Sequence, residues 1–156
     1  MTTNDTTATP ARRLDHARTA PKVFRAMIAL DAAAREGLDP ALVELVQMRT
    51  SQLNNCAYCL DMHTKDARKA GETDERIYLL PVWHEAPAGV YSERERAALA
   101  LAEEITRIGG GVSDAVYARA AAHFAEAELA QLISVCLTIN AWNRINIATR
   151  RTPGTR

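Results

Sequence analysis

Apolar residues recur along this chain at intervals of three and four positions, the spacing that gathers side chains on one face of an α-helix. This pattern predicts helices over residues 21–36, 40–53, 55–70, 74–80, 92–108, 113–124 and 126–150. No stretch shows the alternation of apolar and polar β-branched residues that is typical of strands. The chain is therefore predicted to be all-α.

Residues that favour helix ends support these limits. Asp39-Pro40 has the form of an N-cap followed by a first-turn proline, and Ser92 with Glu95 has the form of a capping box. The WHEAPAG segment, residues 83–89, contains proline and glycine and is predicted to be a loop. We expect a bundle of about six to eight helices.

Length and composition fit a single folded unit. The chain has 156 residues, of which 47% are hydrophobic and 24% charged, so it is long enough to form a core as one domain. Residues 2–9 are rich in threonine and lack helical spacing. We expect a flexible N-terminal tail over residues 1–13, a helical domain over 14–150 and a short C-terminal tail over 151–156.

Charge and hydropathy argue against several classes of partner and location. The 19 Lys and Arg residues balance 19 Asp and Glu residues, and the lack of a basic block argues against a nucleic-acid or anionic membrane surface. The N-terminal segment lacks the apolar region of a signal peptide, and no apolar run approaches the roughly 20 residues of a membrane-spanning helix. We therefore expect a cytoplasmic protein.

The segment from Glu44 to His63 carries the candidate chemistry. Cys56 and Cys59 form a C-x-x-C pair, and His63 follows Cys59 by four residues. On a helix these three side chains share one face, which brings two thiols and a base together. Three cysteines are too few for a disulfide scaffold, and a C-x-x-C pair in a reducing compartment is typical of redox or metal-binding sites.

A turn is needed to bring Glu44 to this face. It lies 12 residues before Cys56, and on one unbroken helix the two would be about 18 Å apart. Asn54 and Asn55 favour the end of one helix and the start of another, because asparagine is a poor helix-interior residue. In the resulting antiparallel hairpin Glu44 and His63 lie level, so we expect the carboxylate and the imidazole to meet directly or through one water.

Two cues bear on which thiol reacts, and they disagree. A free cysteine is only a few per cent ionised at pH 7, so a nucleophilic thiol needs a helix N-terminus or a base beside it. The helix N-terminus favours Cys56, which lies nearest to it, whereas His63 favours Cys59. We give more weight to the specific base, and predict that Cys59 attacks and Cys56 resolves.

Other interpretations of these residues stay open. The C-x2-C-x3-H pattern is half the ligand set of a structural zinc site, but no second C-x-x-C or close pair of histidines occurs, so we predict no bound metal. Glu44 alone could be a solvated helix residue, and His63 a surface histidine. Cys136 follows the apolar spacing of the last helix, which favours a small buried side chain over a second resolving thiol.

A resemblance to a known family rests on three segments: ELVQMRTSQLNNCAYCLDMHTKDARKAG, YSERERAALALAEEIT and INAWNRINIATR. Together they resemble the alkylhydroperoxidase D-like branch of the carboxymuconolactone decarboxylase family, over about residues 14–150. The resemblance implies an all-α fold that assembles as trimers or hexamers. It also implies a thiol peroxidase in which Cys59 attacks a hydroperoxide and Cys56 closes a disulfide, with Glu44 and His63 as the proton relay.

One position departs from the family pattern. The well-known peroxidases of this branch have a histidine directly before the second cysteine, and this chain has Tyr58, whose side chain is not a base near neutral pH. Our first hypothesis is a hydroperoxide reductase that uses no metal, haem or flavin and is restored by an external dithiol or protein reductant. The alternatives are the family's ring-lactone decarboxylase and a non-enzymatic redox-sensing or zinc-binding helical module.

Overall fold

The computed structural model describes residues 11–154, which form α-helices and two short 3-10 helices and contain no β-strand. The helices are α1 (His16–Thr19), α2 (Pro21–Arg35), α3 (Pro40–Leu53), α4 (Ala57–Lys69), α5 (Asp74–Leu79), η1 (Leu80–Glu85), α6 (Glu93–Thr106), η2 (Ile108–Gly110), α7 (Asp114–His123) and α8 (Glu126–Ala148). The all-α prediction is confirmed. Residues 1–10 of the predicted N-terminal tail and 155–156 of the predicted C-terminal tail lie outside the described residues, and the domain limits stay predictions.

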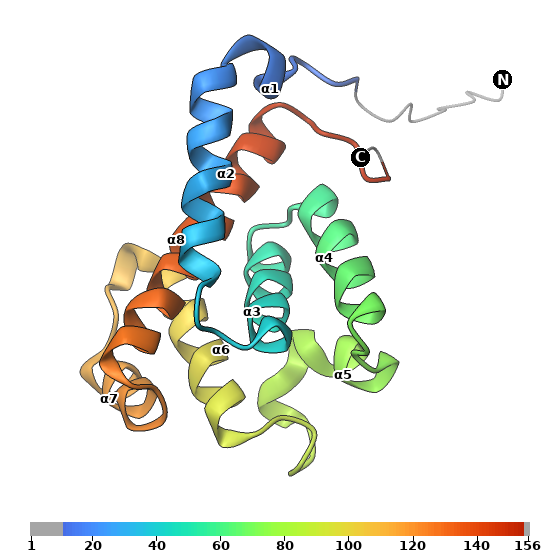
Figure 1. Cartoon of the computed structure of the whole chain (residues 1–156). Coiled ribbons are helices and arrows are strands. Elements are labelled where there is room, and N and C mark those ends of the chain that lie inside the picture. The colour runs from blue at the N-terminus through green and yellow to red at the C-terminus, as the bar shows by residue number, and fades with distance from the viewer. Residues whose placement is uncertain (1–10, 155–156) are drawn as a thin grey trace, which may run out of the picture.

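The other long helices pack around α3 or against one another. Helices α3 and α4 form an antiparallel hairpin, and α3 also packs against α6 and α8 (Figure 1). The first long helix, α2, runs beside the last, α8, although the two are far apart in the sequence (Figure 1). Elements from both ends of the chain therefore meet beside the α3–α4 hairpin, and α8 contacts its turn.

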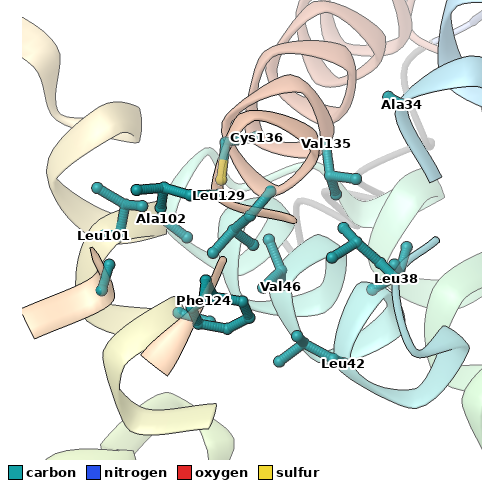
Figure 2. Close-up of a cluster of buried hydrophobic side chains, with 14 residues drawn as sticks. Ala34, Leu38, Leu42, Val46, Leu101, Ala102, Phe124, Leu129, Val135 and Cys136 are labelled. Atoms are coloured by element: carbon teal, nitrogen blue, oxygen red, sulfur yellow. The ribbon is translucent and has the colours of Figure 1, made fainter. Parts of the chain in front are cut away.

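Burial of apolar side chains explains this arrangement. Figure 2 shows the cluster in which α3, α6 and α8 meet, with Val46, Leu101 and Leu129 among its members. Cys136 is fully buried in the same cluster, as the sequence predicted, and burial raises the pKa of its thiol to about 12. This thiol therefore stays protonated and packs as a small apolar side chain.

A buried carboxylate on α6 joins three of these elements. Glu103 on α6 accepts hydrogen bonds from Arg49 Nε on α3 and from Trp83 Nε1 on η1, both at 2.7 Å. A charge removed from water is costly unless it is paired and hydrogen-bonded, and here it is both. Glu103 thus links α3, η1 and α6 through hydrogen bonds.

Two local predictions were wrong. Part of the segment predicted as a loop over residues 83–89 belongs to the 3-10 helix Leu80–Glu85, because Trp83 is drawn into the core by burial and by its bond to Glu103. The cysteine helix begins at Ala57 rather than near Asn55. Asn55 adopts the left-handed conformation, with φ of 56°, which ends one helix and excludes the residue from the next.

We predict a large difference between two leucine truncations on α8. Leu132→Ala removes a side chain with no exposed surface and should lower the free energy of unfolding by about 2–5 kcal/mol, since it leaves a cavity in the core. Leu137→Ala removes a side chain that is 57% exposed and should cost below about 1 kcal/mol. Denaturant unfolding measures both, and equal losses would contradict the packing described.

Candidate active site

The turn between α3 and α4 sets the position of the two neighbouring thiols. Helix α3 ends at Leu53, Asn54 is its C-cap, and the backbone N–H of Cys56 donates to Ser51 O at 3.0 Å. Cys56 thereby becomes the N-cap of α4 and Cys59 lies in the first turn. The predicted hairpin, with the C-x-x-C pair at the start of its second helix, is confirmed.

The carboxylate and the imidazole meet directly across this hairpin. His63 Nδ1 and Glu44 Oε2 are 2.9 Å apart, and the His63 side chain is only 4% exposed. The sequence-based expectation that these residues lie level is correct. Because Nδ1 is occupied by the carboxylate, Nε2 is the ring nitrogen that can exchange a proton with a reacting group.

A residue that sequence reasoning missed holds the other oxygen of this carboxylate. Arg35 on α2 places Nη1 3.4 Å from Glu44 Oε1, and its Nε donates to Asp31 Oδ2 at 2.8 Å. The packing of α2 against α8 brings Arg35 to the hairpin, and no local pattern in the sequence indicates such a contact. Glu44 is thus held between an imidazole and a guanidinium.

The two thiols of the C-x-x-C pair touch each other and are both buried. Cys56 Sγ donates to Cys59 Sγ at 2.7 Å, and no disulfide joins them. A second donor comes from α8, where Asn146 Nδ2 lies 3.3 Å from Cys59 Sγ. The sulfur of Cys59 therefore accepts hydrogen bonds from two sides, while that of Cys56 donates one.

These contacts shift the pKa values of the two thiols in opposite directions. The hydrogen bond from Cys56 is the main cause that lowers the pKa of Cys59, to about 6, against the opposing effect of burial. Asn146 and Asn143 lower this pKa further, and a charge on His63 contributes least. The shared hydrogen bond and burial raise the pKa of Cys56. At neutral pH Cys59 is thus the thiolate and Cys56 the thiol.

This electrostatic balance corrects one part of the sequence reasoning. On spacing alone, His63 one turn away favours Cys59 as the attacking residue, yet the neighbouring thiol and the α8 amides stabilise the Cys59 thiolate more than the imidazole does. The His63 ring lowers the pKa of Cys59 through its charge, and the strongest hydrogen bond to this sulfur comes from Cys56 instead. Its role in proton transfer stays a prediction.

A stripe of asparagines on α8 supports the thiol pair. Asn140, Asn143 and Asn146 recur every three residues, and the first two accept hydrogen bonds at 2.9 Å from Asn54 Nδ2 at the hairpin turn. Asn143 Nδ2 in turn donates to Ser51 Oγ at 3.1 Å. The signal was present in the sequence, because three amides at helical spacing on an apolar helix need hydrogen-bond partners in the core.

A cavity of about 460 Å³ lies against only one of the two sulfurs. Cys59, His63 and Asn146 line it, and Cys56 does not. Its apolar walls come from three helices: Phe24 and Ile28 of α2, Met62 of α4 and Trp142 of α8. A ligand in this cavity would therefore meet the thiolate first.

Other features of the described residues do not offer comparable chemistry. A cavity of about 640 Å³ between α6, α7 and α8 is almost wholly apolar and is lined by no cysteine or histidine. Residues 11–154 contain no group of three or more His, Cys, Asp or Glu side chains that could hold a metal ion. Within the same residues, none of the helices has the length and hydropathy needed to cross a bilayer.

Comparisons with known proteins identify the family of this chain. The model of the carboxymuconolactone decarboxylase family matches residues 21–104. The uncharacterised protein YdfG of Bacillus subtilis is 40% identical over 140 residues, which cover 88% of this chain and 94% of YdfG.

Two solved structures share the fold. A protein of unknown function from Agrobacterium tumefaciens, suggested to be the antioxidant defence protein AhpD, is 33% identical with a TM-score of 0.88, over 94% of this chain and all of that one. The debrominase Bmp8 is similar at a TM-score of 0.77 over 88% of this chain and 74% of its own. At 18% identity, Bmp8 shows the fold alone.

We predict that alkylation of Cys59 titrates with a midpoint near pH 6, because the thiolate is the reactive form and its rate rises as pH passes the pKa. Cys56→Ala removes the main hydrogen-bond donor and should raise this midpoint, and Asn146→Ala should raise it less. The rate of iodoacetamide reaction across pH measures each value. Cys136→Ala is the control and should leave the midpoint unchanged; a Cys56→Ala midpoint equal to that of the unmodified chain would refute this origin of the acidity.

Proposed function

Because this chain belongs to the carboxymuconolactone decarboxylase family and to its AhpD-like branch, we propose that it is a thiol-dependent peroxidase that reduces hydroperoxides. One observation carries the proposal. The sulfur with the lowered pKa, Cys59, is also the one that lines the cavity, and its neighbour Cys56 is a protonated thiol in contact with it.

The first step consumes the peroxide. Cys59 enters this step as the thiolate, the proton that its leaving group will need is held on His63, and Glu44 stabilises this imidazolium through Nδ1. The Cys59 thiolate then attacks the terminal peroxide oxygen, so that an S–O bond forms and the O–O bond breaks. The departing alkoxide receives the proton from His63 and leaves as the alcohol. Cys59 is oxidised to a sulfenic acid and the peroxide is reduced.

The second step closes the disulfide. Cys56 attacks the sulfur of the sulfenic acid, an S–S bond forms, the S–O bond breaks, and the thiol proton leaves with the hydroxyl as water. The two sulfurs are already 2.7 Å apart, so condensation requires little movement of the helix start. This closeness supports Cys56 as the resolving residue.

An external dithiol or protein reductant completes the cycle. It supplies two electrons and two protons to the Cys56–Cys59 disulfide and is itself oxidised to a disulfide. None of these steps uses a metal, haem or flavin. Assembly as a trimer or hexamer and a cytoplasmic location remain predictions, which light scattering and cell fractionation would test.

Consumption of cumene hydroperoxide in the presence of dithiothreitol tests the proposal. Cys59→Ser should abolish turnover, because serine supplies no comparable nucleophile. Undiminished consumption by this variant would rule the mechanism out. Lactone decarboxylation by a Cys56→Ser/Cys59→Ser double variant would instead favour the other chemistry of the family.

The relay makes a separate prediction. His63→Gln should lower kcat/KM about 10²-fold or more, the usual range for general acid–base catalysis, and Glu44→Gln should lower it less, because the carboxylate acts through the imidazole. Both should also shift the pH–rate profile. Glu75→Gln replaces an exposed carboxylate on α5 and should change neither quantity. Identical behaviour of Glu44→Gln and this control would remove Glu44 from the mechanism.

A further inference from the structure

The cavity beside Cys59 has the size and lining of a site for an organic molecule. Its volume of about 460 Å³ lies within the usual range for small-molecule pockets, whereas hydrogen peroxide needs far less space. Phe24 and Trp142 form one wall, their rings in an edge-on contact with centroids 5.3 Å apart. Ile28 and Met62 extend this apolar surface. The walls therefore suit the hydrocarbon part of a hydroperoxide.

The two arginines that line this cavity differ in whether a carboxylate pairs with them. Arg35 is engaged by the carboxylates of Asp31 and Glu44. The guanidinium of Arg151 instead lies over the Tyr58 ring, 4.1 Å from its centroid, and forms no ion pair with a carboxylate in the part of the chain that the structure describes. Among residues 11–154, Arg151 thus brings to the cavity a positive charge that no carboxylate pairs with.

The contact with Tyr58 gives this guanidinium a defined place. Stacking on an aromatic face holds the guanidinium plane while its N–H groups stay free to donate at the edges. The backbone N–H of Arg151 also donates to Asn146 O at 2.9 Å, which ties the residue to the end of α8. A planar fork of donors held in this way matches the geometry of a carboxylate.

We infer that the preferred substrates are organic hydroperoxides with an apolar body and a carboxylate, which Arg151 binds while the peroxide group meets Cys59. This inference rests on the proposed peroxidase function and names the substrate class of the same cavity. It also assigns Tyr58 a role as the platform for Arg151. Arg151 is then a substrate-binding residue that takes no part in the proton transfers.

Two matched probes test the inference: the hydroperoxide of linoleic acid, which carries a carboxylate charge, and its methyl ester, in which a methyl group removes that charge. The unmodified protein should show a higher kcat/KM for the acid. Arg151→Ala should lower kcat/KM for the acid about tenfold or more and leave the ester nearly unchanged, since only the acid loses an ion pair. Arg151→Lys should recover part of the loss, because it keeps the charge but not the planar fork.

Arg25→Ala is the matched control, because Arg25 is an exposed arginine on the same helix as Phe24 and does not line the cavity. Equal rates with acid and ester in the unmodified protein would overturn the inference and leave the peroxidase function standing. An equal loss for both probes in Arg151→Ala, or the same selective loss in Arg25→Ala, would also overturn it. If the protein consumes none of the three hydroperoxides (acid, ester or cumene hydroperoxide), the proposed function itself is refuted.

Discussion

The hydrogen bond between the two sulfurs is the interaction on which the candidate site depends. Two buried thiols three residues apart cannot both carry a negative charge, because like charges in a low-dielectric interior repel strongly. The proton held by Cys56 lets Cys59 carry the charge instead. The same contact separates the attacking and resolving roles in the proposed cycle, since the Cys59 thiolate lines the cavity and the Cys56 thiol does not.

The rest of the fold keeps this pair in place and keeps its polar neighbours paired. Helix α8 supplies Asn143 and Asn146, and the hairpin turn supplies Asn54, so that amide groups from distant segments satisfy one another in the core. The Glu44–His63 contact joins the two helices of the hairpin at the level of the cavity. A site of this kind depends on the whole bundle, because removing one amide would leave another buried and unpaired.

Much of the fold could be predicted from local patterns, and less of the site. Helical spacing identified the long helices, and residue counting placed Glu44 level with His63, because both follow from fixed helix geometry. The contacts of Arg35 and Arg151 could not be found in this way, since they depend on how chain ends pack against the hairpin. The main cause of the low pKa of Cys59 could not be predicted either. Spacing alone favours His63, whereas the contacts in the folded chain favour the neighbouring thiol and an α8 amide.

The most direct test of the central claim is to find which sulfur a hydroperoxide oxidises first. Cys56→Ser keeps a hydroxyl donor beside Cys59 but prevents disulfide formation, so the oxidised state can be trapped. After one equivalent of cumene hydroperoxide and treatment with dimedone, peptide mass spectrometry should find a single sulfenic acid adduct, on Cys59. An unmodified Cys59 in this variant, together with a dimedone adduct on Cys56 in Cys59→Ser, would contradict the assignment.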